Sequence, residues 1–139
     1  MSTNIRAEVS KDNPYWIPKH RYYELKHFCM QYPYWHEKIN MINLMPEVKP
    51  NNIKECSPSD PVYAAFEERQ KYWGLIDIVE DAAFETTGRD DVAVCLIEGI
   101  TTGSSYDILE AQHEWMPCSK NEYYDLYRKF FWILDKKRG

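Results

Sequence analysis

The sequence contains no long hydrophobic run. No stretch approaches the roughly 18–20 uncharged apolar residues that cross a bilayer, so we expect no contact with a membrane. The opening residues, MSTNIRAEVSKDNPYW, also lack the apolar segment of a signal peptide. We therefore expect the protein to remain in the cytoplasm of the cell that makes it.

Paired cysteines and glycine-rich loops are missing as well. Cys29, Cys56, Cys95 and Cys118 lie far apart and form no Cys-x-x-Cys pair, which favours reduced thiols over a disulfide framework. The chain has only 5 glycines, and no GxGxxG, Walker or HExxH element is present. These absences predict a protein that is not an enzyme and that needs no cofactor or metal.

Two groups of side chains have the right types for chemistry but lack the right spacing. The first is the stretch 20–36, where histidines and one cysteine recur without any zinc-binding pattern. The second is Cys118 with His113, which could meet across a turn as nucleophile and base, although no third orienting group is evident. We expect packing and surface roles for both groups.

The residues that are present predict one folded domain with an uneven charge distribution. In 139 residues, 44% are hydrophobic and 15% aromatic, which is enough for a core and excludes a disordered chain. Residues 1–54 carry 8 Lys and Arg against 5 Asp and Glu, residues 55–114 carry 3 against 14, and residues 115–139 carry 6 against 3. An acidic middle between two basic ends bears on partners and not on fold.

The N-terminal third predicts an arm and two helices. Residues 1–17 are polar and then aromatic, and apolar residues recur at helical spacing from Lys19 onward. Pro33 either ends the first helix or begins the second at its first turn. We expect residues 1–45 to form a loose arm and a compact helical hairpin. The expected core positions are Tyr22, Leu25, Phe28, Cys29 and Tyr32 in the first helix, and Trp35, Ile39 and Ile42 in the second, with Met45 as a further candidate.

A proline-rich linker over residues 46–60 leads into a helical domain over residues 61–139. Ser59 or Asp60 would cap its first helix, which runs to about residue 87 with Pro61 at its first position. Gly74 within it costs roughly 1 kcal/mol relative to alanine, which indicates close packing or a bend. The expected buried stripe is Val62, Ala65, Phe66, Trp73, Ile76, Val79 and Ala83.

Three shorter helices follow, and cap signals mark where two of them begin. Ser104 with Asp107 forms an S-x-x-D pair, and Ser119 with Glu122 forms a full S-x-x-E capping box. The helix before them has no such pair, and Asp90 is its predicted cap residue. The expected core of these helices is Val92, Cys95, Leu96 and Ile100, then Tyr106, Ile108 and Leu109, and then Tyr123, Phe130, Phe131, Leu134 and either Leu126 or Tyr127.

The helical periodicity predicts an all-α fold, a small bundle ending in a helix-turn-helix arrangement. In that motif the last helix enters the major groove of DNA by its N-terminal half. With the apolar side facing inward, the outward side chains are Lys120, Asn121, Tyr124, Arg128 and Lys129. Asparagine suits adenine edges, arginine suits guanine or phosphate, and lysine suits phosphate. We expect these five residues to bind double-stranded DNA.

The segment EGITTGSSYDILEAQHEWMPCSKNEYYDLYRKFFWIL resembles the C-terminal helix-turn-helix of the sigma region 4 superfamily. It is most similar to small phage and prophage regulators of the ArpU and RinA kind. The resemblance implies a phage protein that acts in a bacterial host and switches on late phage genes. Host RNA polymerase is a further expected partner, on which the acidic middle would dock. The matching residues are Gly103, Ser105 and Tyr106 at the entry, and Ser119, Tyr123, Tyr124 and Arg128 in the last helix.

The acidic middle supports a different function. The side chains of Asp77, Asp81, Glu85, Asp90 and Asp91 are usually just a solvated outer face, but they also suit docking of a basic partner. The alternative hypothesis is therefore a phage protein that binds a host protein through this surface and inhibits or redirects it. A palindromic DNA site would require a homodimer, and the sequence leaves the oligomeric state open.

Overall fold

The computed structural model describes residues 11–44 and 61–139, and within these ranges the protein is all-helical and contains no strand. The linker over residues 46–60, the candidate core residue Met45 and the candidate caps Ser59 and Asp60 lie outside the described residues, as do residues 1–10. The all-α prediction is confirmed. The helices are α1 (Lys19–Cys29), α2 (Tyr32–Asn43), α4 (Pro61–Thr87), α5 (Asp90–Thr102), α6 (Tyr106–His113) and α7 (Lys120–Arg138).

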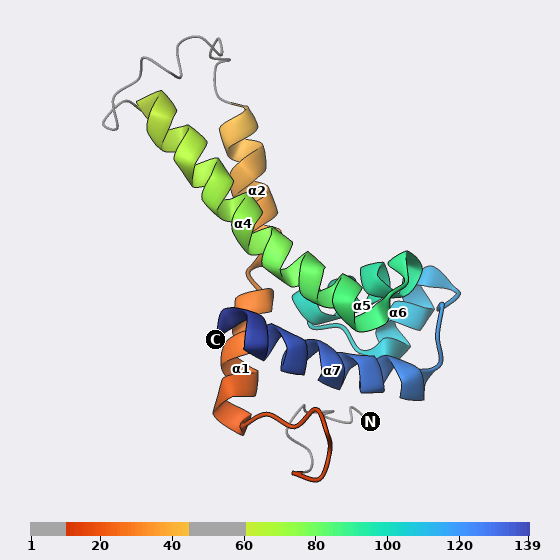
Figure 1. Ribbon diagram of the computed structural model, residues 1–139. Helices are drawn as coiled ribbons and strands as arrows, with labels where there is room; N and C mark the ends of the chain where they lie inside the picture. Colours follow the sequence, from red (N-terminus) through yellow and green to blue (C-terminus); the bar gives the residue numbers. More distant parts are fainter. Residues whose placement is uncertain (1–10, 45–60) are drawn as a thin grey trace.

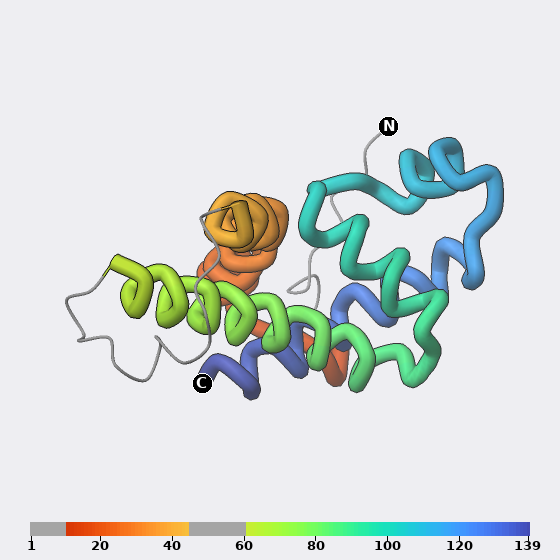
Figure 2. Tube along the Cα trace, turned by 90° about the horizontal axis from the view of Figure 1, so that it is seen from above, coloured from red at the N-terminus to blue at the C-terminus, as the bar shows by residue number. Residues whose placement is uncertain are grey.

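Helix α4 is the central element of the fold. Its first half lies beside α2, and the two helices project from the body; its second half lies beside α5 and α7 (Figures 1 and 2). Because only the second half is enclosed on several sides, the buried residues of α4 begin at Ile76. They are Ile76, Val79, Ala82, Ala83 and Thr86.

Helices α1 and α2 do not form the expected hairpin. They follow one another in nearly the same direction (Figure 1), and while α1 packs against α5 and α7, α2 packs mainly against α4. Met30 and Gln31, which join them, keep right-handed helical backbone angles, so the chain does not reverse there. Four of the five buried residues predicted for the first helix are buried in α1, whereas the fifth, Tyr32, lies in α2 and is half-buried. Pro33 does lie in the first turn of α2.

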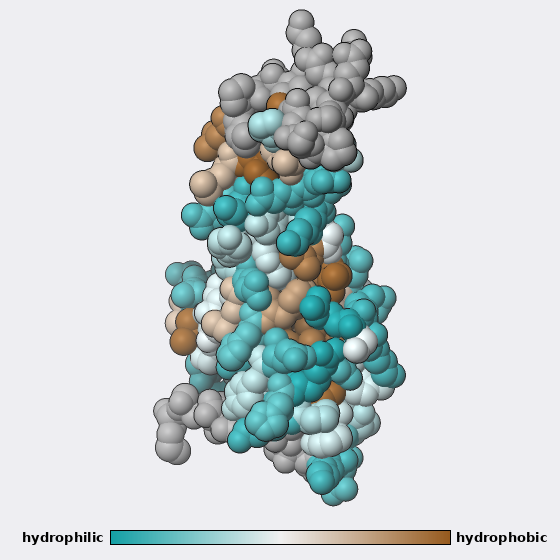
Figure 3. All heavy atoms as spheres, turned by 90° about the vertical axis from the view of Figure 1, so that its left-hand side faces the viewer, coloured by the Kyte–Doolittle hydropathy of each residue, from teal (hydrophilic) through white to brown (hydrophobic). Residues whose placement is uncertain are grey.

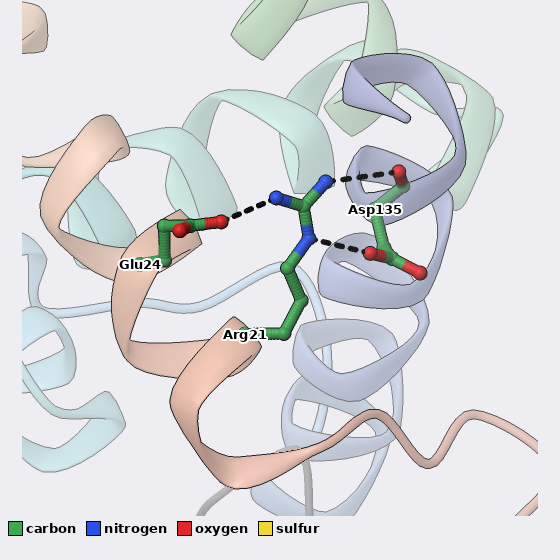
Figure 4. Close-up of polar contacts among 3 residues, drawn as sticks. All are labelled: Arg21, Glu24 and Asp135. Carbon is green, nitrogen blue, oxygen red and sulfur yellow. Dashed lines mark hydrogen bonds and ion pairs between the residues drawn. The ribbon is translucent and has the colours of Figure 1, made fainter.

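Polar contacts hold α1 against the C-terminal half of α7. Arg21 Nε donates to Asp135 Oδ1 at 2.6 Å, Nη2 donates to the Asp135 carbonyl oxygen at 3.4 Å, and Nη1 pairs with Glu24 (Figure 4). The hydroxyls of Tyr22 and Tyr127 share a hydrogen bond of 2.6 Å beside this network. Burial strongly raises the pKa of Tyr127, so its hydroxyl remains neutral and can serve as a donor.

The described part of the arm, residues 11–17, is packed and not loose. Ile17 is only 2% exposed, and the Tyr15 ring meets the Trp132 ring edge-on with centroids 5.4 Å apart. Asn13 shapes the turn: its Oδ1 accepts from the Tyr15 amide at 2.8 Å, and its carbonyl accepts from the Trp16 amide at 3.0 Å. The arm therefore lies on α7.

Two residues predicted to pack closely in α4 face solvent instead. Trp73 is 41% exposed at the edge of the α2 contact, where its ring centroid lies 5.9 Å from that of His36. Gly74 is exposed, and an added Cβ would meet no atom within 4 Å. Of the two explanations predicted for Gly74, close packing or a bend, close packing is therefore wrong.

Gly74→Ala is expected to raise the free energy of unfolding by about 1 kcal/mol. Alanine adopts helical backbone angles at a lower entropic cost than glycine, and here the methyl group meets nothing. Urea unfolding followed by circular dichroism measures the change. A loss of stability would mean that this helix needs glycine for a reason other than space.

Among the described residues, no single helix is both long and apolar enough to cross a bilayer. Only α5 and α6 taken together, bent by 118° at the break between them, reach the necessary length and composition.

Candidate nucleic-acid interface

The α6–α7 unit, residues 104–138, is built on two capped helix N-termini. The Ser105 hydroxyl accepts from the Ile108 amide at 3.3 Å, and the Ser119 hydroxyl accepts from the Glu122 amide at 3.2 Å. The Ser119 cap is confirmed, whereas Ser105 takes the place predicted for Ser104. The difference arises because Gly103, in the left-handed region at φ 73°, ends α5 and turns the chain so that the Ser104 amide still bonds to α5.

Side chains join the two N-termini to one another. The Tyr106 amide donates to Tyr124 Oη at 3.2 Å, and Tyr106 Oη donates to the Cys118 carbonyl at 2.7 Å. Across the surface, Lys120 Nζ lies 3.0 Å from Asp107 Oδ2. The first turns of α6 and α7 are therefore fixed side by side, and first-turn amides carry partial positive charge.

A close approach between α5 and α7 sets the position of this unit. Tyr123 is 1% exposed and enters where α5 has only backbone: a Cβ added to Gly99 would lie 2.1 Å from Tyr123 Oη and 3.0 Å from Leu109 Cδ1. Tyr123 Oη has no hydrogen-bond partner among the described residues, and burial raises the pKa of this hydroxyl. One signal of this contact is visible in the sequence, namely a single glycine within an apolar helix.

The five predicted DNA-contacting residues are not equally accessible. Lys120 and Asn121 are exposed, as expected. Tyr124 is half-buried against the ring of Tyr123, with centroids 5.1 Å apart, so it helps to position α6. The Arg128 side chain is only 16% exposed. The prediction that Tyr124 and Arg128 face outward freely is therefore wrong.

Arg128 is held by its own helix. Its Nη1 lies 3.3 Å from Asp125 Oδ1 and 3.4 Å from the Tyr124 carbonyl oxygen. Its Nε is buried and finds no partner within the part of the chain that the structure describes. Lys129, one position further, is half-buried and forms no ion pair with any described residue. Of the cations in the first half of α7, Lys129 is thus the one that has no carboxylate partner among the described residues.

The predicted acidic docking residues are all exposed, but two of them are already paired. Glu85 accepts from Lys137 Nζ at 3.0 Å, and Asp91 pairs with Arg89 at 3.1 Å. In residues 11–44 and 61–139, no ion pair involves the others, which are Asp77, Asp81 and Asp90. Of these three, Asp77 and Asp81 lie one helical turn apart on α4.

Two exposed aromatic side chains next to these carboxylates were not anticipated. Trp73 and Phe84 are 41% and 40% exposed, and Asp77 and Asp81 lie between them at spacings of three and four residues, which puts all four on one side of α4. Trp73 fits the apolar stripe expected along this helix, which is why it was predicted to be a core residue.

The other candidate chemistry does not assemble. His113 Nε2 pairs with Glu98 Oε2 at 2.6 Å, and burial raises the pKa of the Cys118 thiol, which keeps it protonated near neutral pH. In the described ranges, no three His, Cys, Asp or Glu side chains gather as a metal site.

No protein-family model matches the chain, and no curated protein or solved structure is significantly similar to it. The α6–α7 unit and the charges around it are therefore the basis for assigning a function.

Proposed function

We propose that the protein is a DNA-binding transcription regulator in which the α6–α7 unit acts as a sigma-region-4-like helix-turn-helix. The observation that carries the proposal is the pair of capped N-termini held side by side, with Lys120 and Asn121 exposed on the first turn of α7. A helix N-terminus attracts phosphate, and the first turns of a recognition helix reach base edges in the major groove.

The side chains of this surface divide into contacting and positioning groups. Asn121 can read an adenine edge, and Lys120 can bind phosphate or guanine. The pair that Lys120 makes with Asp107 lies in solvent, where it is screened and adds little, so an approaching phosphate can replace it. Tyr124 keeps α6 in place, and Arg128 must leave its contacts with Asp125 before it can reach DNA.

The charge distribution supports the same orientation on DNA. The exposed carboxylates of α4 repel phosphate, whereas α7 carries cations along its outer side, so a duplex approaches by the α7 side. The resemblance to phage regulators makes promoters of late phage genes the proposed sites, with host RNA polymerase as a further partner. A homodimer is required where the site is palindromic.

Binding of the purified protein to pooled phage and bacterial DNA fragments across a salt series tests this proposal. We expect saturable binding to particular fragments, with log K falling against log salt by roughly 0.9 for each phosphate contacted. The slope therefore gives the number of contacts. Absence of binding even at low salt would remove DNA recognition as the function.

A second candidate function is supported by the exposed face of α4. Exposed aromatic rings are typical of protein-binding hot spots, and Trp73 and Phe84 bracket Asp77 and Asp81, whose negative charge would attract a basic partner. The protein would then bind a basic surface of a host protein and inhibit or redirect it. Asp77→Lys combined with Asp81→Lys would abolish that activity and leave DNA binding intact.

A further inference from the structure

The outer side of α7 continues beyond its first turns as a row of cations and one aromatic ring. Lys129, Trp132 and Lys136 lie three and four residues apart and so share one side of the helix. Lys136 Nζ lies 3.4 Å from the centroid of the Trp132 ring, and the edge-on contact with Tyr15 brings the arm to the same place. The described part of the arm runs below α7 in Figure 1.

The arm adds a cation to this surface. Lys11 Nζ lies 6.0 Å from the centroid of the Trp16 ring, one residue from the Tyr15 that meets α7. A cation held over an aromatic ring keeps its charge while its position becomes restricted. Lys11 and Lys136 are therefore placed by rings and not by carboxylates.

Among the described residues, the cations of this surface lack the carboxylate partners that three other α7 cations have. Lys120, Arg128 and Lys137 each pair with a carboxylate. By contrast, within the part of the chain that the structure describes, Lys129 and Lys136 have no ion pair, and Asp135 between them in sequence is held by Arg21 (Figure 4).

We propose that Lys11, Lys129 and Lys136 form a second contact surface that binds the sugar-phosphate backbone of a DNA duplex. This inference rests on the proposed function, because it extends the same recognition helix. Asn121 and Lys136 are separated by about 22 Å along α7 at 1.5 Å per residue, and by only about 60° around its axis. The helix is thus long enough to contact bases at its N-terminal end and a phosphate strand further along.

Stacking of single-stranded nucleic acid fits this surface less well. Stacking needs an open ring face, but Lys136 covers a face of Trp132 and Tyr15 contacts the same ring. What the surface offers instead is ammonium groups, which bind phosphate as point charges.

The exposed apolar surface of the molecule lies elsewhere, notably at Met41 and Leu44 near the C-terminal end of α2, where Figure 3 also shows apolar atoms.

The test compares the double variant Lys129→Gln, Lys136→Gln with the matched double variant Lys38→Gln, Lys71→Gln, which removes the same charge from α2 and α4. Each protein is titrated with a duplex fragment selected by the wild type, across a salt series, after circular dichroism has verified folding. We expect the slope of log K against log salt to become less negative by about 1.8 in the first variant, at roughly 0.9 per lost phosphate contact. It should be unchanged in the second. Lys11→Gln alone should change the slope by about half as much.

Three outcomes would overturn the inference, and they are distinguishable. If the wild type binds no duplex at any salt concentration, the proposed function fails and the second contact surface fails with it. If the wild type binds but the α7 variant keeps the wild-type slope, DNA recognition stands and this surface is not part of it. If an oligothymidine strand binds tighter than the duplex and the α7 variant loses only that binding, the surface serves single strands.

Discussion

Replacing Gly99 with alanine is expected to lower the free energy of unfolding by about 2 kcal/mol, and adding Tyr123→Phe is expected to restore most of the loss. The new Cβ would lie 2.1 Å from Tyr123 Oη, so α5 and α7 must move apart. Overpacking of this kind costs about 1–3 kcal/mol, and occasionally more. We expect a cost at the upper end of that range or above it, of which the better helix propensity of alanine offsets about 1 kcal/mol.

Phenylalanine at position 123 relieves the clash because the overlapping atom is the hydroxyl oxygen. Tyr123→Phe by itself should leave stability unchanged or raise it by about 1 kcal/mol, since it removes a buried hydroxyl that has no hydrogen-bond partner among the described residues. Urea unfolding of the two single variants and the double variant gives the coupling between the sites. If the two effects simply add, the close approach is not what makes glycine necessary at position 99.

Gly74→Ala is the matched control for this cycle. The same substitution is made inside a helix, but where the added methyl group meets no atom within 4 Å. The two alanine substitutions should therefore change stability in opposite directions. Equal changes would mean that helix propensity outweighs packing at both positions.

The second large effect is expected for Lys120→Glu combined with Asn121→Ala, which should weaken specific DNA binding about 100-fold. Each substitution removes one contact from the first turn of α7, at roughly tenfold per contact, and glutamate also repels phosphate. Both side chains are exposed, so folding should be unaffected. Affinity is measured by fluorescence anisotropy on the selected duplex, with melting temperature as the check on folding.

Asp77→Lys combined with Asp81→Lys is the matching double variant, which reverses the charge of two carboxylates on α4. These residues are exposed on α4, so the change should leave DNA affinity equal or slightly higher. Retained DNA binding in the Lys120 and Asn121 variant, together with loss of biological activity in the Asp77 and Asp81 variant, would support the protein-docking function instead.

Local sequence signals predicted the helices well. Pro61 and Gly88 mark the two ends of α4, and the Ser119 capping box marks the start of α7. These features depend on the backbone angles and hydrogen bonds of a few neighbouring residues, which the sequence contains directly. The buried residues of α1 were also predicted, because a helix enclosed by its neighbours buries the whole of its apolar stripe.

Features that depend on which helices meet could not be predicted in this way. Trp73 fits the apolar stripe of α4, yet it lies at the edge of the α2 contact and remains 41% exposed. Arg128 fits the polar side of α7, yet it folds back onto Asp125. The hairpin expected from α1 and α2 does not form, because Met30 and Gln31 keep helical backbone angles and the chain does not reverse there. These angles accompany the packing of α1 on α7.

Hydrogen–deuterium exchange with and without a selected duplex tests the central claim most directly. With the duplex bound, we expect slower exchange at the first turns of α6 and α7, residues 104–108 and 119–123, and weaker protection over residues 11–17. Amides in the first turn of a helix have no partner within the helix, so a bound phosphate should slow their exchange. Protection confined to residues 73–84 of α4, or no change at low salt, would contradict DNA recognition by α7.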